Sequence, residues 1–267
     1  MNDAPIVSVI TPLYNSSRWV DGLLDTMRAQ TLLRWQHIVV DDGSTDDGVG
    51  KVEAASAVDP RVKLIRLSCN SGPSRARNVG LAAANTRFVA FLDADDRWVP
   101  EKLERQLKFM QQECVGFSYH DYVHLSEDGT RIGRSVKGPN RLDWVTLHKR
   151  RGVGCLSVVI DRTKCADPSF PEDTANLAED FQAWSRLLKG NDVKARRLNE
   201  VLGFYRIVGT SRSSAKKSAA ISVWRIYRDQ EDIPVLRAAW YWLSAMLGAA
   251  YNHFRARPSR PLRTTIL

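Results

Sequence analysis

Two apolar segments of this sequence each end in a group of carboxylates. These acids are Asp41 and Asp42 after residues 36–40, and Asp93, Asp95 and Asp96 after residues 88–92. Short, nearly continuous apolar runs are typical of strands that are covered on both faces. Because ionised acids are not buried unpaired, we expect them at the carboxyl ends of the strands, where open parallel sheets bind ligands. Five carboxylates at one crevice repel one another, which predicts a divalent cation and a hydroxyl-rich ligand there.

Two further segments lead toward the same crevice. Residues 7–11 form a third apolar run, and Pro12 keeps the polar turn that follows it from becoming helical. Residues 70–80 contain a Gly-Pro loop that leads into a helix with Arg75 and Arg77 in its first turns. Cations at that end of a helix are unfavourable for its dipole, so a nearby anion such as a diphosphate would explain them.

Four motifs follow one another in the first hundred residues. They are Thr11-Pro-Leu-Tyr-Asn15, Asp41-Asp-Gly-Ser-Thr-Asp46, Ala76-Arg-Asn-x-Gly80 and Leu92-Asp-Ala-Asp-Asp96. With them, the chain resembles the family 2 glycosyltransferases of the GT-A fold. The resemblance implies an α/β fold, with a Rossmann-like mixed central sheet flanked by helices, and a nucleotide sugar as donor. Looser motifs are similar to a subgroup that builds teichuronic acid, exopolysaccharide and O-antigen: residues 117–122, 154–157, 179–184 and 205–208.

The resemblance also implies roles for the residues at the donor side. Asp42 matches the position that hydrogen-bonds the nucleobase, and Pro12 and Tyr14 match positions that flank it. Asp93 matches the ribose ligand and Asp95 the ligand of Mg²⁺ or Mn²⁺, with Asp96 as the competing metal ligand. The alternating directions of an extended segment would place Asp93 and Asp95 on the same side.

Four further charged residues could bind a ligand or could have a structural role. Arg77 and Arg206 could contact the diphosphate, because a guanidinium pairs with phosphate oxygens through two parallel hydrogen bonds. Arg206 could instead tie the sheet to the helix that carries Glu179. Asp46 and Asp47 are expected to cap the helix after their turn rather than to bind a ligand.

The candidate catalytic acids are Asp180 and Glu179. Asn176 and Glu179 have the spacing of a capping box, which predicts a helix from about residue 176. Its buried stripe is expected to consist of Phe181, Trp184 and Leu188. The helix alone would explain both acids as first-turn residues. The resemblance places the catalytic base in this pair, and we assign it to Asp180 with Glu179 as the alternative. The implied reaction is a single displacement that inverts the anomeric carbon.

The composition excludes several other classes. With 43% hydrophobic and 26% charged residues, the chain has the composition of a globular enzyme, and its four cysteines lack metal-site spacing, which indicates reduced thiols. No basic region followed by a long apolar one opens the chain, so we expect a cytoplasmic protein. Of the net charge of +9, residues 216–267 hold a surplus of +6, with nine Lys or Arg against three Asp or Glu. This concentration argues against a noncatalytic nucleic-acid-binding protein, and we expect no nucleic-acid partner.

Two other enzyme classes are also disfavoured. Processive polysaccharide synthases have a Gln-x-x-Arg-Trp motif and membrane spans of about 20 apolar residues, and the chain has neither. Sugar-phosphate nucleotidyltransferases need a glycine-rich arginine loop near the N-terminus, where this chain has residues 12–15.

The chain divides into three predicted parts. Residues 1–97 form the donor-binding half, residues 98–214 the acceptor and catalytic half of the same domain, and residues 215–267 basic amphipathic helices. The expected strands are 6–11, 36–41, 62–67, 87–92, 116–122, 153–160 and 201–206, with a hairpin turn at 127–130. The expected helices are 17–29, 47–57, 73–84, 102–110 and one from 176.

The last part has two open interpretations. Residues 238–251 are too short to span a membrane but carry the interfacial aromatics Trp240, Tyr241 and Trp242. They could form a peripheral helix on the cytoplasmic face of the inner membrane, where a saccharide or lipid-linked saccharide acceptor is presented. Alternatively, a helical stripe could pack on the catalytic domain or on a second copy in a homodimer. That stripe would consist of Trp240, Leu243, Leu247 and Tyr251.

Overall fold

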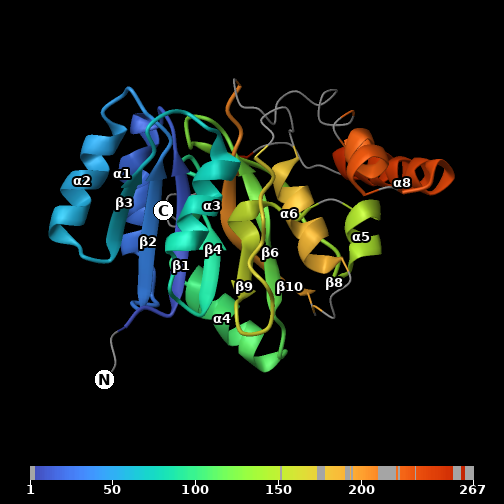
Figure 1. Cartoon of the computed structure of the whole chain (residues 1–267), viewed down its shortest axis with the longest axis horizontal. Helices are drawn as coiled ribbons and strands as arrows, with labels where there is room; N and C mark the ends of the chain where they lie inside the picture. Colours follow the sequence, from blue (N-terminus) through green and yellow to red (C-terminus); the bar gives the residue numbers. More distant parts are fainter. Residues whose placement is uncertain are drawn as a thin grey trace.

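A long mixed sheet forms the centre of the molecule (Figure 1). The computed structural model describes residues 4–150, 152–172, 178–189, 193, 195–209, 221, 223–231, 233–254 and 260–261. The strands are β1 (Val7–Leu13), β2 (Trp35–Asp41), β3 (Val62–Arg66), β4 (Phe88–Phe91), β5 (Arg97–Trp98), β6 (Phe117–Leu125), β7 (Arg131–Val136), β8 (Arg141–Leu142), β9 (Val158–Asp161), β10 (Ala195–Arg206) and β11 (Arg260–Pro261). The helices are α1 (Ser17–Arg28), α2 (Gly48–Val58), α3 (Pro73–Ala83), α4 (Lys102–Gln112), α5 (Trp144–Lys149), η1 (Cys155–Ser157), α6 (Glu179–Leu188), η3 (Ile226–Gln230) and α8 (Val235–Phe254).

The N-terminal half confirms the predicted alternation of strands and helices. Strands β3, β2, β1 and β4 lie side by side and are all parallel. Pro12 does not lie in a turn, as the sequence suggested, but inside β1, where it pairs with Val40. The paired register of β1 with β4 ends at Ile10, so Pro12 lies beyond it, and a residue without an N–H group is tolerated there.

The second half adds antiparallel and parallel strands to the same sheet. Strand β9 runs antiparallel to both β4 and β6, and β10 runs parallel to β6. The predicted hairpin is confirmed: β6 and β7 are antiparallel, and Gly129 takes a positive φ in the turn between them. The predicted strand at 153–160 is wrong in its first part, because residues 155–157 form the 3₁₀ helix η1 and only 158–161 are a strand.

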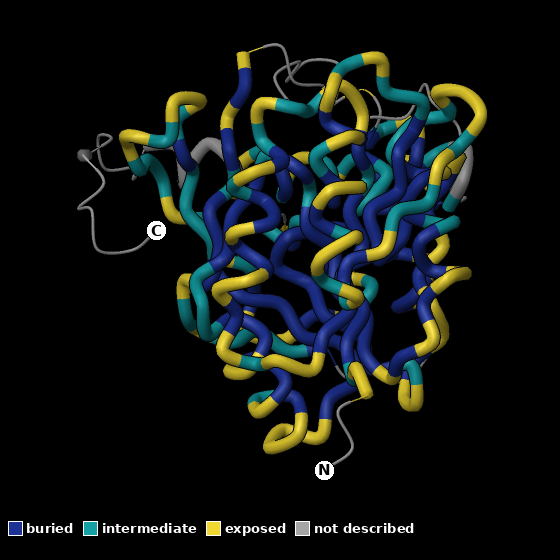
Figure 2. The backbone as a smooth tube through the Cα atoms, turned by 90° about the vertical axis from the view of Figure 1, so that its left-hand side faces the viewer, coloured by how far each residue is buried: buried dark blue, intermediate teal, exposed yellow. Residues whose placement is uncertain are grey.

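Helices cover both faces of the sheet. Apolar side chains of α1, α2 and α4 form one buried cluster with Val7, Val9 and Val39. Side chains of α3, α5 and α6 form the other cluster with Ile10 and Ile38 on the opposite face. Because successive strand residues point to opposite faces, β1 and β2 contribute to both clusters. Figure 2 shows the buried residues in the interior and the exposed residues at the outside, on helices as well as on loops.

Gly80 explains why α3 approaches β1 closely. A Cβ atom at Gly80 would lie 2.5 Å from Cγ2 of Ile10, a distance that real Cβ contacts do not show. The glycine of the Ala-Arg-Asn-x-Gly motif is therefore a packing residue, and it sets how near α3, with Arg77 on it, lies to the strand ends.

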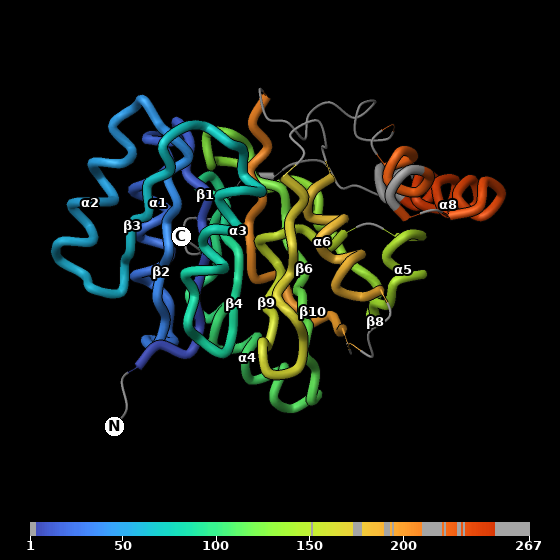
Figure 3. Tube along the Cα trace, viewed as in Figure 1, coloured from blue at the N-terminus to red at the C-terminus, as the bar shows by residue number. Residues whose placement is uncertain are grey.

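The C-terminal segment packs against the core through α5. Tyr227 of η3 and Tyr241 of α8 are buried, and both rings contact His148 of α5. The predicted packing of Trp240, Leu243 and Leu247 on the catalytic domain is wrong, because these three are exposed. The side chain of Tyr251 lies outside the described residues. Figure 3 shows α8 beyond α5, at the far side from β3. Within the described part of the chain, no helix has the length and apolar character needed to cross a membrane.

Candidate active site

Asp42 organises the loop that leads into α3. Its carboxylate is buried and accepts hydrogen bonds from the backbone N–H groups of Ser71 and Gly72, both at 2.7 Å. Asp41 accepts a hydrogen bond from the N–H of Ser44 at 3.0 Å and so holds the glycine turn. Tyr14 lies at the end of β1 and is 46% exposed, so its ring is available to a ligand.

Of the two acids in the following turn, Asp46 has the expected structural role. Asp46 accepts hydrogen bonds from the N–H of Gly48 at 3.1 Å and from the N–H of Ser17 at 2.8 Å, so it serves the first residues of both α2 and α1. Asp47 occupies the N-cap position of α2, although its side chain makes no capping hydrogen bond.

Asp93, Asp95 and Asp96 lie in a tight turn at the end of β4. The N–H of Asp96 donates to the carbonyl of Asp93 at 3.1 Å, so the prediction of an extended segment is wrong. We call these three residues the acid turn. Asp96 is buried, and its Oδ1 accepts a hydrogen bond from the N–H of Arg206 at 3.0 Å. Its Oδ2 has no hydrogen-bond partner among the described residues.

The acid turn is electrostatically strained. Burial and the charge of Asp93 raise the pKa of Asp95 to about 6. Burial and the charges of Asp95 and Asp93 raise the pKa of Asp96 well above its ordinary value. Closely spaced carboxylates in a partly buried site resist ionising together, and a cation relieves that repulsion. The unpaired oxygen of Asp96 and the raised pKa of Asp95 therefore fit a divalent ion at this turn.

Arg77 connects the acid turn to α6. Its buried guanidinium donates from Nη2 to Oδ1 of Asp93 at 2.7 Å, and Nη1 lies 3.7 Å from Oε1 of Glu179. Burial opposes the charge of Arg77, but Asp93, Cys155 and Glu179 more than compensate and raise its pKa. The contacts in the structure are thus with carboxylates, and the predicted contact with a diphosphate stays a prediction.

Arg206 holds the acid turn against the β6–β7 hairpin. Its Nε donates to the carbonyl of Asp95 at 2.8 Å, and Nη1 donates to the carbonyls of Ser126 and Glu127 at 3.1 and 2.9 Å. The guanidinium also stacks on the ring of Trp19 at 4.4 Å. The suggested link from Arg206 to the helix of Glu179 is wrong, since these contacts join it to the turn and the hairpin instead.

The helix that carries the candidate base begins later than its capping pattern predicted. Ala178 is the N-cap residue of α6 and Glu179 its first helical residue, so Glu179 is not at the third position of a capping box. Asn176 lies outside the described residues. Oδ1 of Asp180 accepts a hydrogen bond from the N–H of Phe181 at 2.7 Å. Both acids are half-buried.

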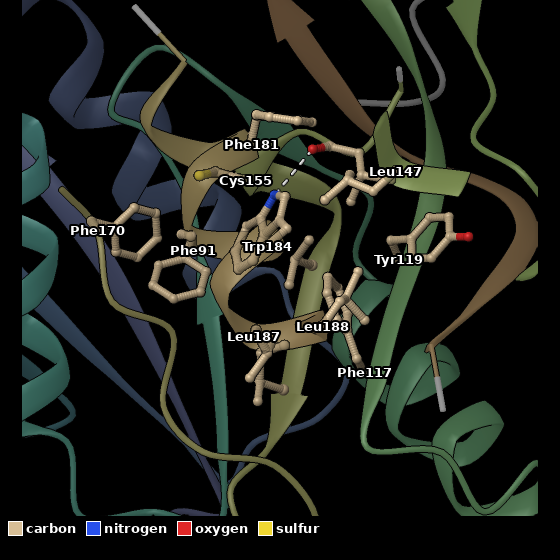
Figure 4. Packing of buried hydrophobic residues seen from close by; sticks show 14 of the residues in the cluster. Phe91, Phe117, Tyr119, Leu147, Cys155, Phe170, Phe181, Trp184, Leu187 and Leu188 are labelled. Carbon is tan, nitrogen blue, oxygen red and sulfur yellow. Dashed lines mark hydrogen bonds between the residues drawn. The ribbon is translucent and has the colours of Figure 1, made fainter. Parts of the chain in front are cut away.

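The side chain of Trp184 fixes the position of α6. The indole is fully buried against Phe91, Phe117 and Phe170, and its Nε1 donates to the carbonyl of Val153 at 3.2 Å (Figure 4). The predicted stripe of Phe181, Trp184 and Leu188 is confirmed as buried. This stripe fixes one side of α6 to the core. Glu179, in the first turn of α6, then lies near Arg77.

Two residues that the sequence analysis did not select interact electrostatically with acids of both the acid turn and α6. Burial raises the pKa of the Cys155 thiol well above its ordinary value; Arg77 opposes this shift, and Asp180, Asp93 and Glu179 add to it. Burial also raises the pKa of Tyr122, together with Tyr205, Asp180 and Asp96. Asp180 therefore acts electrostatically on the same groups as the acid turn does, which places the two in one site.

The sequence motifs could have identified Cys155 and Tyr122 only in part. Cys155 and Tyr122 belong to the looser motifs 154–157 and 117–122, but neither motif indicates which side chain faces the acids.

All four cysteines are free thiols, as predicted. Figure 4 shows Cys155 in the buried cluster that also contains Phe181 and Trp184.

Residues 8–158 match the family described as Glycosyl transferase family 2. The chain belongs to this family. It is 36% identical over 239 residues to TuaG of Bacillus subtilis (strain 168), which is named as a teichuronic acid biosynthesis glycosyltransferase; the match covers 90% of this chain and 94% of TuaG. It is 34% identical over 251 residues to WfgD of Escherichia coli, which is named UDP-Glc:alpha-D-GlcNAc-diphosphoundecaprenol beta-1,3-glucosyltransferase; the match covers 94% of this chain and 96% of WfgD.

Solved structures support the fold of this glycosyltransferase. S. aureus TarS in complex with UDP-GlcNAc superimposes with a TM-score of 0.68 at 20% identity, over 93% of this chain and 72% of that one. The mannosyltransferase PcManGT from Pyrobaculum calidifontis, in complex with GDP-Man and Mn²⁺, gives a TM-score of 0.65 at 18% identity, over 94% and 76%. The predicted α/β GT-A architecture is confirmed. Family membership also rules against a noncatalytic nucleic-acid-binding protein and a nucleotidyltransferase.

Proposed function

We propose that this glycosyltransferase moves one sugar from a UDP-sugar to a hydroxyl group of a lipid-linked saccharide in the synthesis of a surface polysaccharide. The name of WfgD, a relative matched over nearly its whole length, supports this choice of donor and acceptor. The reaction would take place in the cytoplasm. Asp42, Pro12 and Tyr14, at the carboxyl ends of β1 and β2, would receive the nucleobase.

The observation that carries the proposal is the connection of the acid turn to α6 through Arg77. This connection supports the proposal, because the acids that would bind the donor and the acids that would act on the acceptor share one guanidinium. Glu179 faces Arg77, which favours a role in holding that guanidinium. We therefore assign the general base to Asp180, which would take the proton of the acceptor hydroxyl as its oxygen attacks the anomeric carbon. Attack from the side opposite the leaving diphosphate inverts the configuration.

The acid turn supplies the candidate metal ligands Asp95 and Asp96. Among the described residues, no three His, Cys, Asp or Glu side chains are arranged to hold an ion, so these acids offer part of a coordination shell. Mg²⁺ or Mn²⁺ at this turn would neutralise charge on the departing nucleoside diphosphate. Arg77 binds the side chain of Asp93, and Arg206 binds the backbone carbonyl of Asp95. Because these contacts fix the acid turn, they would also fix where the donor binds.

Calorimetric titration with nucleotides tests the proposal. UDP should bind in the presence of Mn²⁺ more tightly than GDP, dTDP or CDP. Asp95→Asn or removal of the metal with EDTA should weaken UDP binding by at least about tenfold, or about 1.4 kcal/mol. The matched control is Asp25→Asn, a carboxyl-to-amide change at an exposed position of α1. UDP affinity that is the same in Asp95→Asn, with EDTA and in the wild type would contradict the assignment.

A further inference from the structure

Helix α8 has two apolar faces, and the rest of the described structure covers one of them. Ala238, Tyr241 and Ala245 are buried against the core. On the opposite side, four large apolar side chains are 88%, 62%, 51% and 69% exposed: Leu236, Trp240, Leu243 and Leu247. We call these four residues the α8 stripe. At about 100° per residue they lie within an arc of roughly 60°, centred opposite the buried face.

The α8 stripe is a continuous surface rather than a set of scattered residues. Spacings of three and four residues place neighbouring side chains over one another on a helix. Contiguous exposed apolar surface on a soluble domain marks a site of interaction with a protein or a membrane. Since Tyr241 already attaches α8 to Trp144 and His148, the stripe is not needed to hold the helix in place.

The charges around the stripe distinguish between these two kinds of partner. Residues 235–254 contain no Asp or Glu, and their single Lys or Arg is the exposed Arg237. Residues 255–267 add four arginines and no acid. A second copy of the chain would bring the same cations to a symmetric contact, and like charges would repel. A surface of anionic lipid attracts them, at about 1 kcal/mol for each cation near the surface.

The location and length of α8 also fit a lipid surface. In Figure 1, α8 lies beside the end of the molecule where α6 begins, which is the end that carries the candidate base. The helix is not apolar and long enough to cross a bilayer. An amphipathic helix with Trp and Leu on its outer face lies in the plane of the interface, with the Trp ring at the level of the headgroups.

We propose that the α8 stripe docks the enzyme on an anionic membrane surface. Leu236, Trp240, Leu243 and Leu247 enter the headgroup region, and the exposed Arg237 contacts lipid phosphates. This contact holds the site beside the bilayer without a spanning helix. It depends on the exposed face of α8 and not on the identity of the donor sugar.

Co-sedimentation with lipid vesicles tests this proposal on the full chain. The variant combines Trp240→Ser, Leu243→Ser and Leu247→Ser, all at exposed positions. The matched control combines Leu33→Ser and Val58→Ser, which remove exposed apolar side chains elsewhere on the surface. Wild type and control should bind phosphatidylcholine vesicles that contain about 30% phosphatidylglycerol, and high salt should release them. The variant should bind at least tenfold more weakly, with an unchanged thermal midpoint and unchanged UDP affinity.

Three results would overturn the proposal. In the first, the wild type does not bind the anionic vesicles. In the second, the triple variant binds them as tightly as the control does. In the third, sedimentation velocity without lipid shows a wild-type dimer that the triple variant converts to a monomer, so that a second copy covers the stripe.

Discussion

The acid turn holds three carboxylates close together, at a cost to stability. Burial raises the pKa of Asp95 and Asp96, and the charges of neighbouring acids raise it further. Arg77 and the backbone N–H of Arg206 compensate only part of the charge. Strongly raised carboxyl pKa values that arise from burial and like charges are typical of functional sites. These shifts support the cation site that we propose at the acid turn.

The raised pKa of Asp95 predicts that Asp95→Asn stabilises the protein at neutral pH. A carboxyl whose pKa is higher in the folded state contributes stability that is present below the unfolded pKa of about 4 and is lost as the pH rises through about 6. Removing the charge should raise the free energy of unfolding by about 2 kcal/mol above pH 7 and by little near pH 4. Chemical denaturation at both pH values measures this, with Asp25→Asn as control. An equal increase in the free energy of unfolding at both pH values would mean that the charge of Asp95 does not cause the stabilisation.

The two acids of α6 give a second prediction. Asp180→Asn should reduce turnover by about a hundredfold or more while UDP affinity stays unchanged, because the lost group acts mainly in the transition state. Glu179→Gln removes the partner of Arg77 and should have a smaller effect on turnover. Steady-state kinetics and calorimetry on both variants measure these quantities. If Glu179→Gln abolishes turnover and Asp180→Asn does not, the base is Glu179.

At the scale of elements, packing of helices on the sheet sets where the charged residues lie. The buried stripe of α6 places Asp180 and Glu179 at its first turn, near the acid turn. The close contact of α3 with β1 brings Arg77 within 2.7 Å of Asp93 and 3.7 Å of Glu179. The geometry of the site therefore depends on residues that do not touch a ligand.

Gly80 allows a direct test of that dependence. Gly80→Ala forces a methyl group against Ile10 and should lower the free energy of unfolding by about 1–3 kcal/mol. The matched control is Gly50→Ala in α2, where a new Cβ meets no atom within 4 Å. It should raise stability by about 0.5–1 kcal/mol, because alanine favours helix more than glycine does. Chemical denaturation compares both. A stabilising Gly80→Ala would show that α3 can move away from β1 at no cost.

At the scale of the whole molecule, the segment after residue 214 belongs to the same core as the sheet. Val223, Ile226, Tyr227 and Tyr241 are part of the buried cluster that contains Trp184. Tyr227 also donates a hydrogen bond to the carbonyl of His148 at 2.7 Å. The division of the chain at residues 97 and 214 stays a prediction, although the two halves share one sheet.

A chain that ends at residue 214 should consequently be less stable than the full chain. Loss of two buried tyrosines and Ile226 exposes the aromatic surface around His148 and Phe181 and should cost several kcal/mol, on the order of 3–5 or more. Thermal unfolding of both chains measures the difference. An unchanged midpoint would show that the segment is an independent appendage, as its composition suggested.

Local patterns in the sequence were sufficient to predict the four parallel strands of the N-terminal half, the acids at their ends and the buried stripe of α6. Burial on both faces requires continuous apolar runs, and a helix with one buried face requires apolar residues at spacings of three and four. Both requirements act within a few residues, so they can be recognised without the fold. The family motifs depend on the same short segments.

Tertiary structure alone decided the partners of the charged residues and the buried face of α8. Arg77 pairs with Glu179, and Arg206 binds the carbonyls of Asp95, Ser126 and Glu127. Cys155 interacts electrostatically with acids of two segments, the acid turn and α6. Such pairs join residues far apart in the chain, and residue type does not specify which of several acids or carbonyls is near. In α8, apolar residues occupy both sides, so periodicity could not distinguish the face of Tyr241 from that of Trp240. Only the position of α5 makes one of them the inner face.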